Sequence, residues 1–559
     1  MTDTCLNIIT QLTVELHKDD ISKEKLGTGV LYTNRKLSGV VYVLTAKHCL
    51  SKLGEKGRVS LRIYNPDTST YEYVTPVKQS ILLHPVDDAG IIIINKRELA
   101  SVVSDLPSVY VVDKNFGTDE AVSKGFPVAT LNQTNENGES SLAMIRMTYL
   151  HEDITENVFQ LSTNDDYSED TIVGMSGSGI FIEACEELYI NGIFIRYTDE
   201  ERGKVISAQR LISFNKLLEE EYKKKMSLSF LGHHGLGHKT LKNNVEDSVA
   251  NLGPRYCQKV NVRTGTAKYF NCVAKTPAYF ERLYRNIDSW LTEKSYRTRK
   301  DSNRIGQLES HLKAIRDDFT VALSNLDQRV DAIIDLSSLM KRVESLQNEL
   351  EEVRHRFYSD YSSTKKDDNV RKELEADEAR LLEISQDLYS FTENFEDLKI
   401  NLANNPYLII KGEAGCGKSH LLGDVASKRI DDGLPTLLFL GTDFAEETYE
   451  TTITSKVGFV GTFREFLSSF NQIGTQVGSR ALLMIDALNE GPQAVLWKDR
   501  LSGLIKSLKD YPAIGLVVSV RDTYFDDVIP DGVETDSGAT VIEHKGFKGL
   551  EYEAVRQFC

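Results

Sequence analysis

Residues 408–422 read LIIKGEAGCGKSHLL, and this stretch decides the fold of the C-terminal part of the chain. An apolar run leads into a glycine-rich loop of the form GxxxxGKS, and a helical pattern follows. The residues of this motif are Gly412, Gly415, Gly417, Lys418 and Ser419. In such a strand–loop–helix the backbone N–H groups cradle phosphates, the lysine reaches the outer phosphates and the serine hydroxyl binds Mg²⁺. The stretch therefore predicts a site for ATP and Mg²⁺ at the end of a buried strand.

Two later apolar runs end in polar side chains that suit the same site. ALLMIDALNEG (481–491) places four apolar residues before Asp486, which we predict to be the second residue that holds Mg²⁺. Glu490 follows in the next loop, where it is predicted to orient or activate the attacking water. GLVVSVRD (515–522) brings Arg521 to the end of a third strand, where it is predicted to sense the γ-phosphate.

The chain divides into three regions by pattern. Short β-type runs separated by Gly, Asn and Asp turns fill residues 1–215 and predict an all-β barrel or sandwich. Residues 216–400 contain a polar linker and then helical spacings, whose breaks favour a bundle of separate helices over a coiled coil. Residues 401–559 alternate short apolar strands with helices, which is typical of a parallel sheet covered on both faces. The predicted fold is multidomain.

Three short motifs in the N-terminal region carry the residue types of a serine nucleophile and its activating groups. VLTAKHC contains His48, HPVDDAGIIII contains Asp88 beside Asp87, and GMSGSGIF contains Ser176. An imidazole takes the proton of the serine hydroxyl, and a carboxylate holds the imidazole in the right tautomer. The glycines permit a tight turn, so the N–H groups of Gly174 and Ser176 are predicted to form an oxyanion hole. Asp88 is the predicted acid, and Asp87 fits a looser register.

The order His, Asp, Ser with these flanks resembles the trypsin-like, chymotrypsin-fold serine proteases over roughly the first 210 residues. TAKHC stands where that family has TAAHC, and GMSGSG stands where it has GDSGGP. The resemblance implies a double β-barrel with His48, Asp88 and Ser176 as catalytic triad. It places Asp170 where trypsin-like enzymes have the acid of the primary specificity pocket, although an exposed loop carboxylate is an equal alternative. Cys49 keeps a half-cystine position without an upstream partner, which fits a reducing compartment.

The C-terminal region resembles the STAND class of P-loop NTPases, and IDALNEG is similar to the AVAST (Avs) antiviral ATPases. Two further segments are similar to sequences that flank the ATPase core of that family, namely NLGPRYCQKVNV and HKGFKGLEYEAVRQF. The resemblance implies a homo-oligomer, a tetramer, whose assembly is triggered by a viral (phage) protein. It also implies a winged-helix segment and sensor repeats, which are missing from this chain. We therefore expect a truncated form or a fragment of a longer product.

Composition sets the outer limits of these interpretations. The chain has 559 residues, with 66 Lys and Arg and 83 Asp and Glu, so its net charge is −17. A chain this acidic is not expected to have nucleic acid as a partner. No apolar run has the ~20 residues that span a bilayer, and no signal peptide is visible, so neither a membrane partner nor secretion is expected. Seven scattered cysteines without CxxC pairs indicate neither a disulfide framework nor a zinc site. We expect a cytoplasmic protein.

The sequence predicts an antiviral signalling protease in which ATP-dependent assembly activates a trypsin-like endopeptidase that cleaves a host or partner protein. One alternative is a trypsin-like domain that only binds a peptide, with the ATPase as the working part. Another is a quality-control protease that uses ATP to degrade misfolded substrates.

Overall fold

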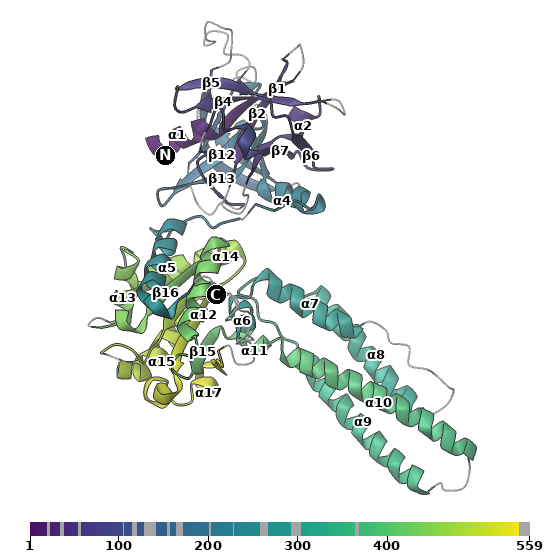
Figure 1. Cartoon of the computed structure of the whole chain (residues 1–559). Helices are drawn as coiled ribbons and strands as arrows, with labels where there is room; N and C mark the ends of the chain where they lie inside the picture. Colours follow the sequence, from purple (N-terminus) through teal and green to yellow (C-terminus); the bar gives the residue numbers. More distant parts are fainter. Residues whose placement is uncertain are drawn as a thin grey trace. The chain divides into compact units, whose positions relative to one another are not determined.

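A computed structural model of the chain divides into two compact units (Figure 1). The first comprises Met1–Lys242, Asp431–Leu434 and Gly458–Val460, and the second comprises Asn243–Ile430, Pro435–Val457 and Gly461–Cys559. The structure describes the chain except residues 20–22, 34–38, 54–56, 104, 114–119, 128–140, 154–156, 164–171, 201–202, 227, 258–265, 292–302, 364–367, 446–447, 493 and 547–559.

The first unit begins with an antiparallel sheet of seven strands. Its order is β5-β4-β1-β2-β3-β7-β6. The strands are β1 (Thr13–Lys18), β2 (Lys25–Tyr32), β3 (Val40–Thr45), β4 (Val59–Asn65), β5 (Thr70–Val74), β6 (Gln79–Leu83) and β7 (Gly90–Asn95). The middle strands β2, β3 and β7 are rich in valine, leucine and isoleucine that lie in the core. Branched side chains of this kind pack well on a pleated surface, which is why these segments form strands.

The second sheet of this unit closes on itself. Strands β12-β9-β10-β11-β14-β13 follow one another, β13 pairs back onto β12, and β8 joins β13 in parallel. The strands are β8 (Tyr110–Val111), β9 (Ala121–Gly125), β10 (Ala143–Asp153), β11 (Val158–Thr163), β12 (Gly179–Ala184), β13 (Glu187–Glu200) and β14 (Gly203–Arg210). The prediction of an all-β N-terminal region is confirmed, and it includes a closed six-stranded barrel.

Short helices accompany the two sheets. They are α1 (Asp3–Leu12), η1 (Lys96–Glu98), α2 (Lys47–Leu50) and α4 (Leu211–Glu220). Thr2 caps α1 by accepting a hydrogen bond from the N–H of Cys5, and Ile9 and Leu12 bury the apolar face of this helix. Helix α2 follows β3 closely and carries His48, one of the predicted site residues.

The helical part of the second unit confirms the expectation of separate helices. Its elements are α5 (His238–Leu252), η2 (Gly253–Arg255), α6 (Ala267–Ala274), α7 (Pro277–Leu291), α8 (Asn303–Ser324), α9 (Ser337–Ser363), α10 (Asp368–Glu396) and α11 (Ile400–Asn404). Helices α7 to α10 lie side by side in Figure 1 and contact one another in sequence order. Along α8, the expected stripe of Ile305, Leu308, Leu312 and Ile315 is at most 3% exposed. The 3.6-residue period of these side chains gives the helix one apolar face.

The rest of the second unit is built on a parallel sheet of five strands with the order β16-β17-β18-β15-β19. The strands are β15 (Tyr407–Gly412), β16 (Thr436–Leu440), β17 (Ala481–Asp486), β18 (Ile514–Arg521) and β19 (Thr540–Glu543). The helices between them are α12 (Lys418–Asp431), η3 (Gly441–Asp443), α13 (Tyr449–Lys456), α14 (Phe463–Val477), η4 (Ala494–Leu496), α15 (Trp497–Leu508), η5 (Asp522–Tyr524), α16 (Phe525–Val528) and α17 (Val533–Ser537). Strand β17 is buried along its whole length, as expected of a sheet covered on both faces.

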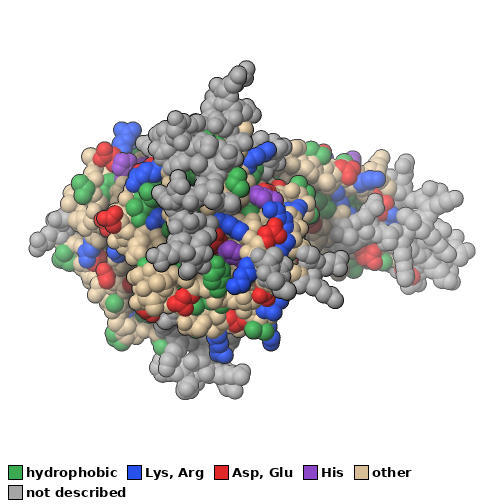
Figure 2. Space-filling view, turned by 90° about the horizontal axis from the view of Figure 1, so that it is seen from above, with side chains coloured by type: hydrophobic (Ala, Val, Ile, Leu, Met, Phe, Trp, Pro, Cys, Tyr) green, Lys and Arg blue, Asp and Glu red, His purple; other side chains and the backbone are tan. Residues whose placement is uncertain are grey.

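Surface charge is mixed. On the face shown in Figure 2, acidic and basic side chains are interspersed among the coloured residues. Among the residues that the structure describes, no helix combines the length and the apolar character that crossing a membrane requires.

An aromatic cluster holds the helical bundle together, and it yields a stability prediction. The rings of Trp290 and Phe391 stack with centroids 3.9 Å apart, and Phe319 meets Phe391 edge-on. We expect Phe391→Ala to cost about 3–5 kcal/mol of unfolding free energy, because it removes a buried ring and leaves a cavity. Denaturant unfolding followed by tryptophan fluorescence measures this cost, since Trp290 is one of two tryptophans.

The matched control lies on the same helix. Tyr389 is 67% exposed, so Tyr389→Ala is expected to change the unfolding free energy by less than about 0.5 kcal/mol. Equal costs for the two variants would contradict the assignment of Phe391 to the core of the bundle.

Candidate functional sites

Strand pairing in the first sheet brings His48 and Asp88 together. Strand β3 ends at Thr45, which is paired with Gly90 at the start of β7. The helix α2 after β3 therefore lies beside the turn before β7. Asp88 Oδ1 accepts a hydrogen bond from the backbone N–H of His48 at 3.0 Å, and Asp88 Oδ2 accepts one from His48 Nδ1 at 2.7 Å. This double contact fixes the ring, with Nδ1 as the protonated nitrogen that faces the carboxylate.

Asp87 faces a different set of partners. Its backbone N–H donates to His84 Nδ1 at 2.8 Å, and its Oδ2 accepts from the side chain of Asn157 at 3.2 Å. Of the two neighbouring acids, the structure places Asp88 against His48.

Gln209 is a residue of this site that the motifs did not reveal. It comes from β14 and is 1% exposed. Its Oε1 accepts the backbone N–H of Asp88 at 3.1 Å, while its Nε2 donates to the carbonyl of Asn157 and to the hydroxyl of Ser213. The side chain thus holds the Asp88 peptide in place. It belongs to no motif, and only the packing of β14 against this turn could have revealed it.

The turn that carries Ser176 is anchored beside the same helix. The carbonyl of Ser176 accepts the N–H of Thr28 at 2.9 Å and the thiol of Cys49 at 3.4 Å. The hydroxyl of Thr28 also donates to the carbonyl of Gly174 at 2.8 Å. Because Cys49 follows His48 directly, these bonds place the Ser176 peptide next to the residue after the histidine.

The turn that carries Ser176 includes the two N–H groups that the sequence predicts to form the oxyanion hole. Gly174 has φ +101°, a conformation that favours glycine. Among the described residues, the N–H groups of Gly174 and Ser176 are absent from the backbone hydrogen bonds of the turn, whereas Met175 and Gly177 donate to Ile172 and Phe194. An oxyanion hole in this turn would use the N–H of the serine itself and that of the residue two positions before it.

The Ser176 hydroxyl points to a backbone carbonyl. Its Oγ donates to the carbonyl of Ile195 at 3.3 Å, which is at the long end of hydrogen-bond distances. Ile195 lies at an irregularity of β13, between Phe194 and Arg196, where the pairing with β14 shifts by one residue. In the part of the chain that the structure describes, no hydrogen bond joins Ser176 to His48. Asp170, the predicted specificity residue, lies outside the described residues.

The electrostatics of the His48–Asp88 pair favour the ionised forms. The hydrogen bond to Asp88, followed by a contact with the Cys49 thiol, raises the pKa of His48 to about 10. Burial acts to raise the pKa of Asp88, but the hydrogen bonds and charge of His48 outweigh it and hold that pKa below its usual range. A doubly bonded pair of this kind keeps His48 as an imidazolium near neutral pH, and an imidazolium cannot accept a proton.

The GxxxxGKS loop in the second unit connects β15 to α12. Gly415 and Gly417 have φ values of +77° and +98°, which residues other than glycine rarely adopt. Lys418 is 7% exposed, and its Nζ donates to the carbonyl of Gly412 at 2.6 Å and to that of Glu413 at 2.8 Å. The lysine is thus bonded to its own loop.

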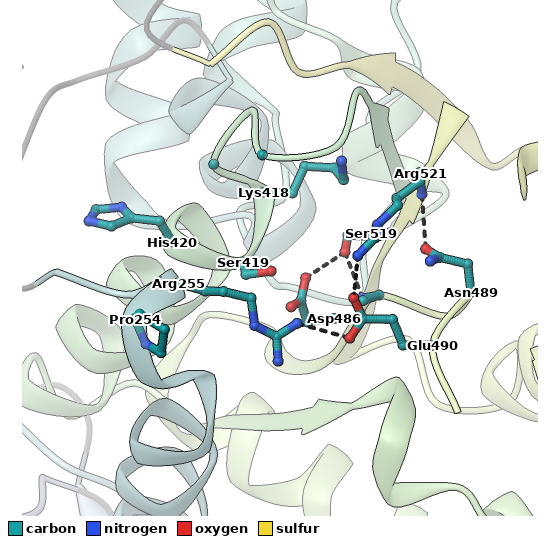
Figure 3. A pocket seen from close by; sticks show the side chains of 13 residues that line it. Pro254, Arg255, Lys418, Ser419, His420, Asp486, Asn489, Glu490, Ser519 and Arg521 are labelled. Carbon is teal, nitrogen blue, oxygen red and sulfur yellow. Dashed lines mark hydrogen bonds and ion pairs between the residues drawn. The ribbon is translucent and has the colours of Figure 1, made fainter. Parts of the chain in front are cut away.

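A cavity of about 330 Å³ lies at the carboxyl ends of β15, β17 and β18 (Figure 3). Its walls come from the loop, from the ends of two further strands, and from a segment that precedes the sheet in the chain. The lining residues are Pro254, Arg255, Gly415, Gly417, Lys418, Ser419, His420, Asp486, Ala487, Asn489, Glu490, Ser519 and Arg521. The structure therefore brings together the predicted residues Lys418, Ser419, Asp486, Glu490 and Arg521.

Asp486 offers an unused oxygen to this cavity. The side chain is 1% exposed, and its Oδ1 accepts a hydrogen bond from Ser519 Oγ at 2.6 Å. Its Oδ2 is buried, and no hydrogen bond to it is formed by the residues that the structure describes. Burial raises the pKa of Asp486, while Ser419 and Ser519 act in the opposite direction. A buried carboxylate oxygen next to a serine hydroxyl is a donor set that fits a hard cation such as Mg²⁺.

Glu490 is held by two arginines. Its Oε1 accepts from Arg521 Nη2 at 2.7 Å, and its Oε2 accepts from Arg255 Nη1 at 2.9 Å. Asn489 also accepts the backbone N–H of Arg521 at 3.0 Å. The sequence predictions do not include Arg255, and the phrase NLGPRYC is the signal that contains it.

The turn around Ser176 depends on a glycine. Gly177 has φ +90°, and a Cβ there would lie 2.0 Å from the carbonyl oxygen of Thr28. Gly177→Ala should therefore lower the thermal unfolding temperature and detach the turn from β2. The control is Gly235→Ala, at φ +83° with nothing within 4 Å, which carries the backbone strain without the clash. Equal unfolding temperatures for the two variants would show that the contact between residue 177 and Thr28 does not constrain the turn.

The His48–Asp88 pair predicts a pH dependence. The folded pKa of His48, about 10, exceeds its ordinary value of 6.5, so the pair stabilises the fold fully below pH 6.5 and this stabilisation is lost as the pH rises towards 10. Asp88→Asn should return the pKa of His48 towards 6.5 and destabilise the fold more at pH 6 than at pH 10. NMR titration of labelled histidines, with His48 assigned from a His48→Gln variant, measures the pKa directly. A wild-type pKa near 6.5 would refute the pairing.

Comparisons with known proteins add no assignment to these sites. No protein-family model matches the chain, and no curated protein matches it at a significant level. The geometry of the two sites is therefore the basis for the function proposed below.

Proposed function

We propose that this chain is a serine endopeptidase whose activity is governed by binding of ATP and Mg²⁺. The observation that carries the proposal is that Asp88 bonds His48 while the next residue, Cys49, bonds the carbonyl of Ser176. The closed six-stranded barrel of the second sheet supports one of the two barrels of a trypsin-like fold. This architecture is the setting in which the family resemblance places His48, Asp88 and Ser176.

The chemistry assigned to the first unit is acyl transfer. Ser176 Oγ attacks a peptide carbonyl, His48 takes the serine proton and later donates it to the leaving amine, and Asp88 orients His48. The N–H groups of Gly174 and Ser176 stabilise the oxyanion that develops. For this to occur, the serine hydroxyl has to leave the carbonyl of Ile195 and His48 has to lose its proton.

The second unit is proposed to be a P-loop nucleotide-binding core of the STAND class. The GxxxxGKS loop lies at the carboxyl end of β15. The chain leaves β15 towards β16 at one edge of the sheet, whereas it leaves the neighbouring β18 towards β19 at the other edge. Open parallel sheets bind ligands at such a point. Lys418 would contact the outer phosphates in place of its own loop carbonyls. Ser419 and Asp486 would hold Mg²⁺, which would neutralise charge on the phosphates, and Glu490 and Arg521 would act at the terminal phosphate.

The biological setting follows from the resemblance to the AVAST proteins. We propose antiviral defence in the cytoplasm, in which a viral protein triggers ATP-dependent assembly into an oligomer, a tetramer in that family. Assembly then activates the protease against a host or partner protein.

A second function is favoured by a specific observation. The Ser176 hydroxyl is bonded to the carbonyl of Ile195, and His48 has a raised pKa of about 10. A domain fixed in this state binds a peptide without cleaving it, and the ATPase is then the catalytically active domain. The quality-control alternative requires steady ATP turnover and degradation of misfolded protein without a trigger.

Labelling with a fluorophosphonate probe separates the protease from the peptide binder. Such a probe reacts with a serine that a neighbouring base activates, so we expect it to label the chain in the presence of ATP and the trigger and not to label Ser176→Ala. Absence of label from the triggered wild-type chain would exclude the protease.

Ser176→Ala and Lys418→Ala should each abolish defence, and only Lys418→Ala should also block assembly. A Ser176→Ala variant that still protects cells would contradict the protease role.

A further inference from the structure

We propose that Arg255 is a phosphate-binding residue of the second unit, which contacts the outermost phosphate of a nucleoside triphosphate and is held by Glu490 when that phosphate is absent. This inference rests on the proposed nucleotide-binding function and adds a residue from outside the sheet to it. It also predicts a way in which the pocket distinguishes triphosphate from diphosphate.

The segment around Arg255 is fixed to the helix that begins at Lys418. Leu252 and Tyr256 pack over Gly423 of α12, where a Cβ would lie 3.1 Å from a carbon of each. The carbonyl of Cys257 accepts a hydrogen bond from His420 Nε2 at 2.9 Å. Because both anchors are on α12, the position of Arg255 is tied to the GxxxxGKS loop.

The charges around Glu490 suit an exchange of anions. Arg255 and Arg521 approach its carboxylate from different sides, and all three side chains line the cavity (Figure 3). No other carboxylate among the described residues pairs with either guanidinium. Glu490 thus occupies a place between two guanidinium groups where a phosphate, as another anion with oxygen acceptors, could also bind.

The existing ion pairs are weak enough to be replaced. The side chains of Arg255 and Arg521 are 40% and 41% exposed, so solvent screens their attraction to Glu490. A phosphate offers two or three oxygens to the planar fork of a guanidinium and carries more charge than a carboxylate. A bound phosphate is therefore expected to displace Glu490 from Arg255.

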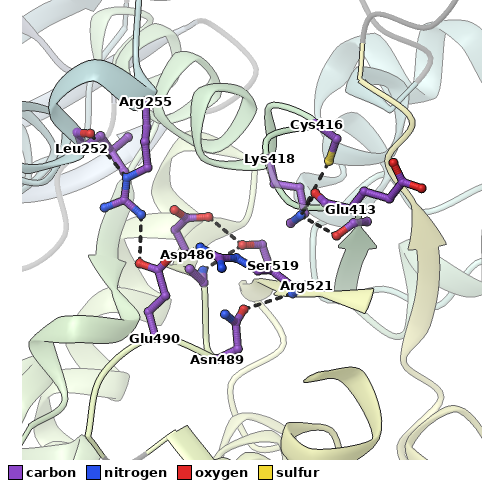
Figure 4. Close-up of polar contacts among 12 residues, drawn as sticks. Leu252, Arg255, Glu413, Cys416, Lys418, Asp486, Asn489, Glu490, Ser519 and Arg521 are labelled. Carbon is purple, nitrogen blue, oxygen red and sulfur yellow. Dashed lines mark hydrogen bonds and ion pairs between the residues drawn. The ribbon is translucent and has the colours of Figure 1, made fainter. Parts of the chain in front are cut away.

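The arrangement also indicates which phosphate is contacted. In Figure 4, Lys418 and the loop lie on one side of Asp486, whereas Arg255 and Glu490 lie on the other. A chain of phosphates that starts in the loop and passes Asp486 reaches Arg255 only with its last member. Arg255 should accordingly contribute to the binding of a triphosphate and not to that of a diphosphate.

Calorimetric titration of the full chain with Mg²⁺ and either AMP-PNP or ADP tests this inference. We expect Arg255→Ala to weaken AMP-PNP binding by about 10- to 100-fold, the usual effect of losing a charge-assisted hydrogen bond, and to leave ADP binding unchanged. Arg255→Lys keeps the charge but loses the fork, so it should fall between wild type and Arg255→Ala. Glu490→Gln releases both arginines and should tighten AMP-PNP binding.

Two further variants make the result specific. Arg464→Ala, at an exposed position of α14 away from the cavity, is the matched control and should bind both nucleotides as wild type does. Lys418→Ala should lose both nucleotides. Circular dichroism melting of each variant shows whether it is folded.

The outcomes separate this inference from the function on which it rests. If wild type binds neither nucleotide, the proposed nucleotide-binding function fails. If wild type binds both and Lys418→Ala does not, but Arg255→Ala binds AMP-PNP like wild type, the role of Arg255 is overturned and the nucleotide site stands. An equal loss of AMP-PNP and ADP in Arg255→Ala also overturns it, because the contact would then not be with the outermost phosphate.

Discussion

Buried backbone has to be hydrogen-bonded, and in both units of this chain that constraint decides where the polar side chains meet. In the first unit, the antiparallel pairing of Thr45 with Gly90 places the end of β3 next to the start of β7, so the histidine after one strand faces the acid before the other. In the second unit, parallel pairing of β15, β17 and β18 brings their carboxyl ends to one edge of the sheet. Each side chain of the candidate sites lies within a few residues of such a strand end or is fixed against one.

The reactive groups of both units are bonded to internal partners. Lys418 donates to carbonyls of its own loop, Glu490 lies between two arginines, and Ser176 donates to the carbonyl of Ile195. Each of these contacts gives a polar group a partner within the protein. A ligand or substrate therefore has to replace an existing bond at each site, and this requirement suits a protein that is proposed to act only after a trigger.

Much of the fold and most of the site residues followed from local patterns. The glycine-rich loop, the apolar runs before Asp486 and Arg521, and the 3.6-residue stripe of α8 are properties of contiguous segments, and the structure has each of them in the expected element. Such patterns favoured Asp88 over Asp87 by register alone, because both lie in one turn and the direction in which the turn presents them depends on packing. Gln209 and Arg255 could not be assigned for a similar reason, since each acts on a residue that is distant along the chain.

The sequence by itself determined the chemical inventory: a histidine, an acid and a serine in order after strand-like runs, and a GxxxxGKS loop with a later acid on a buried strand. It could do so because strand and loop propensities and glycine spacings are local. Only the tertiary structure decided that Asp88 holds His48, that the Ser176 hydroxyl is bonded to Ile195, and that Arg255 shares Glu490 with Arg521. Those outcomes depend on which strand ends and segments pack together, and packing between distant segments is fixed by burial and hydrogen bonding across the whole unit.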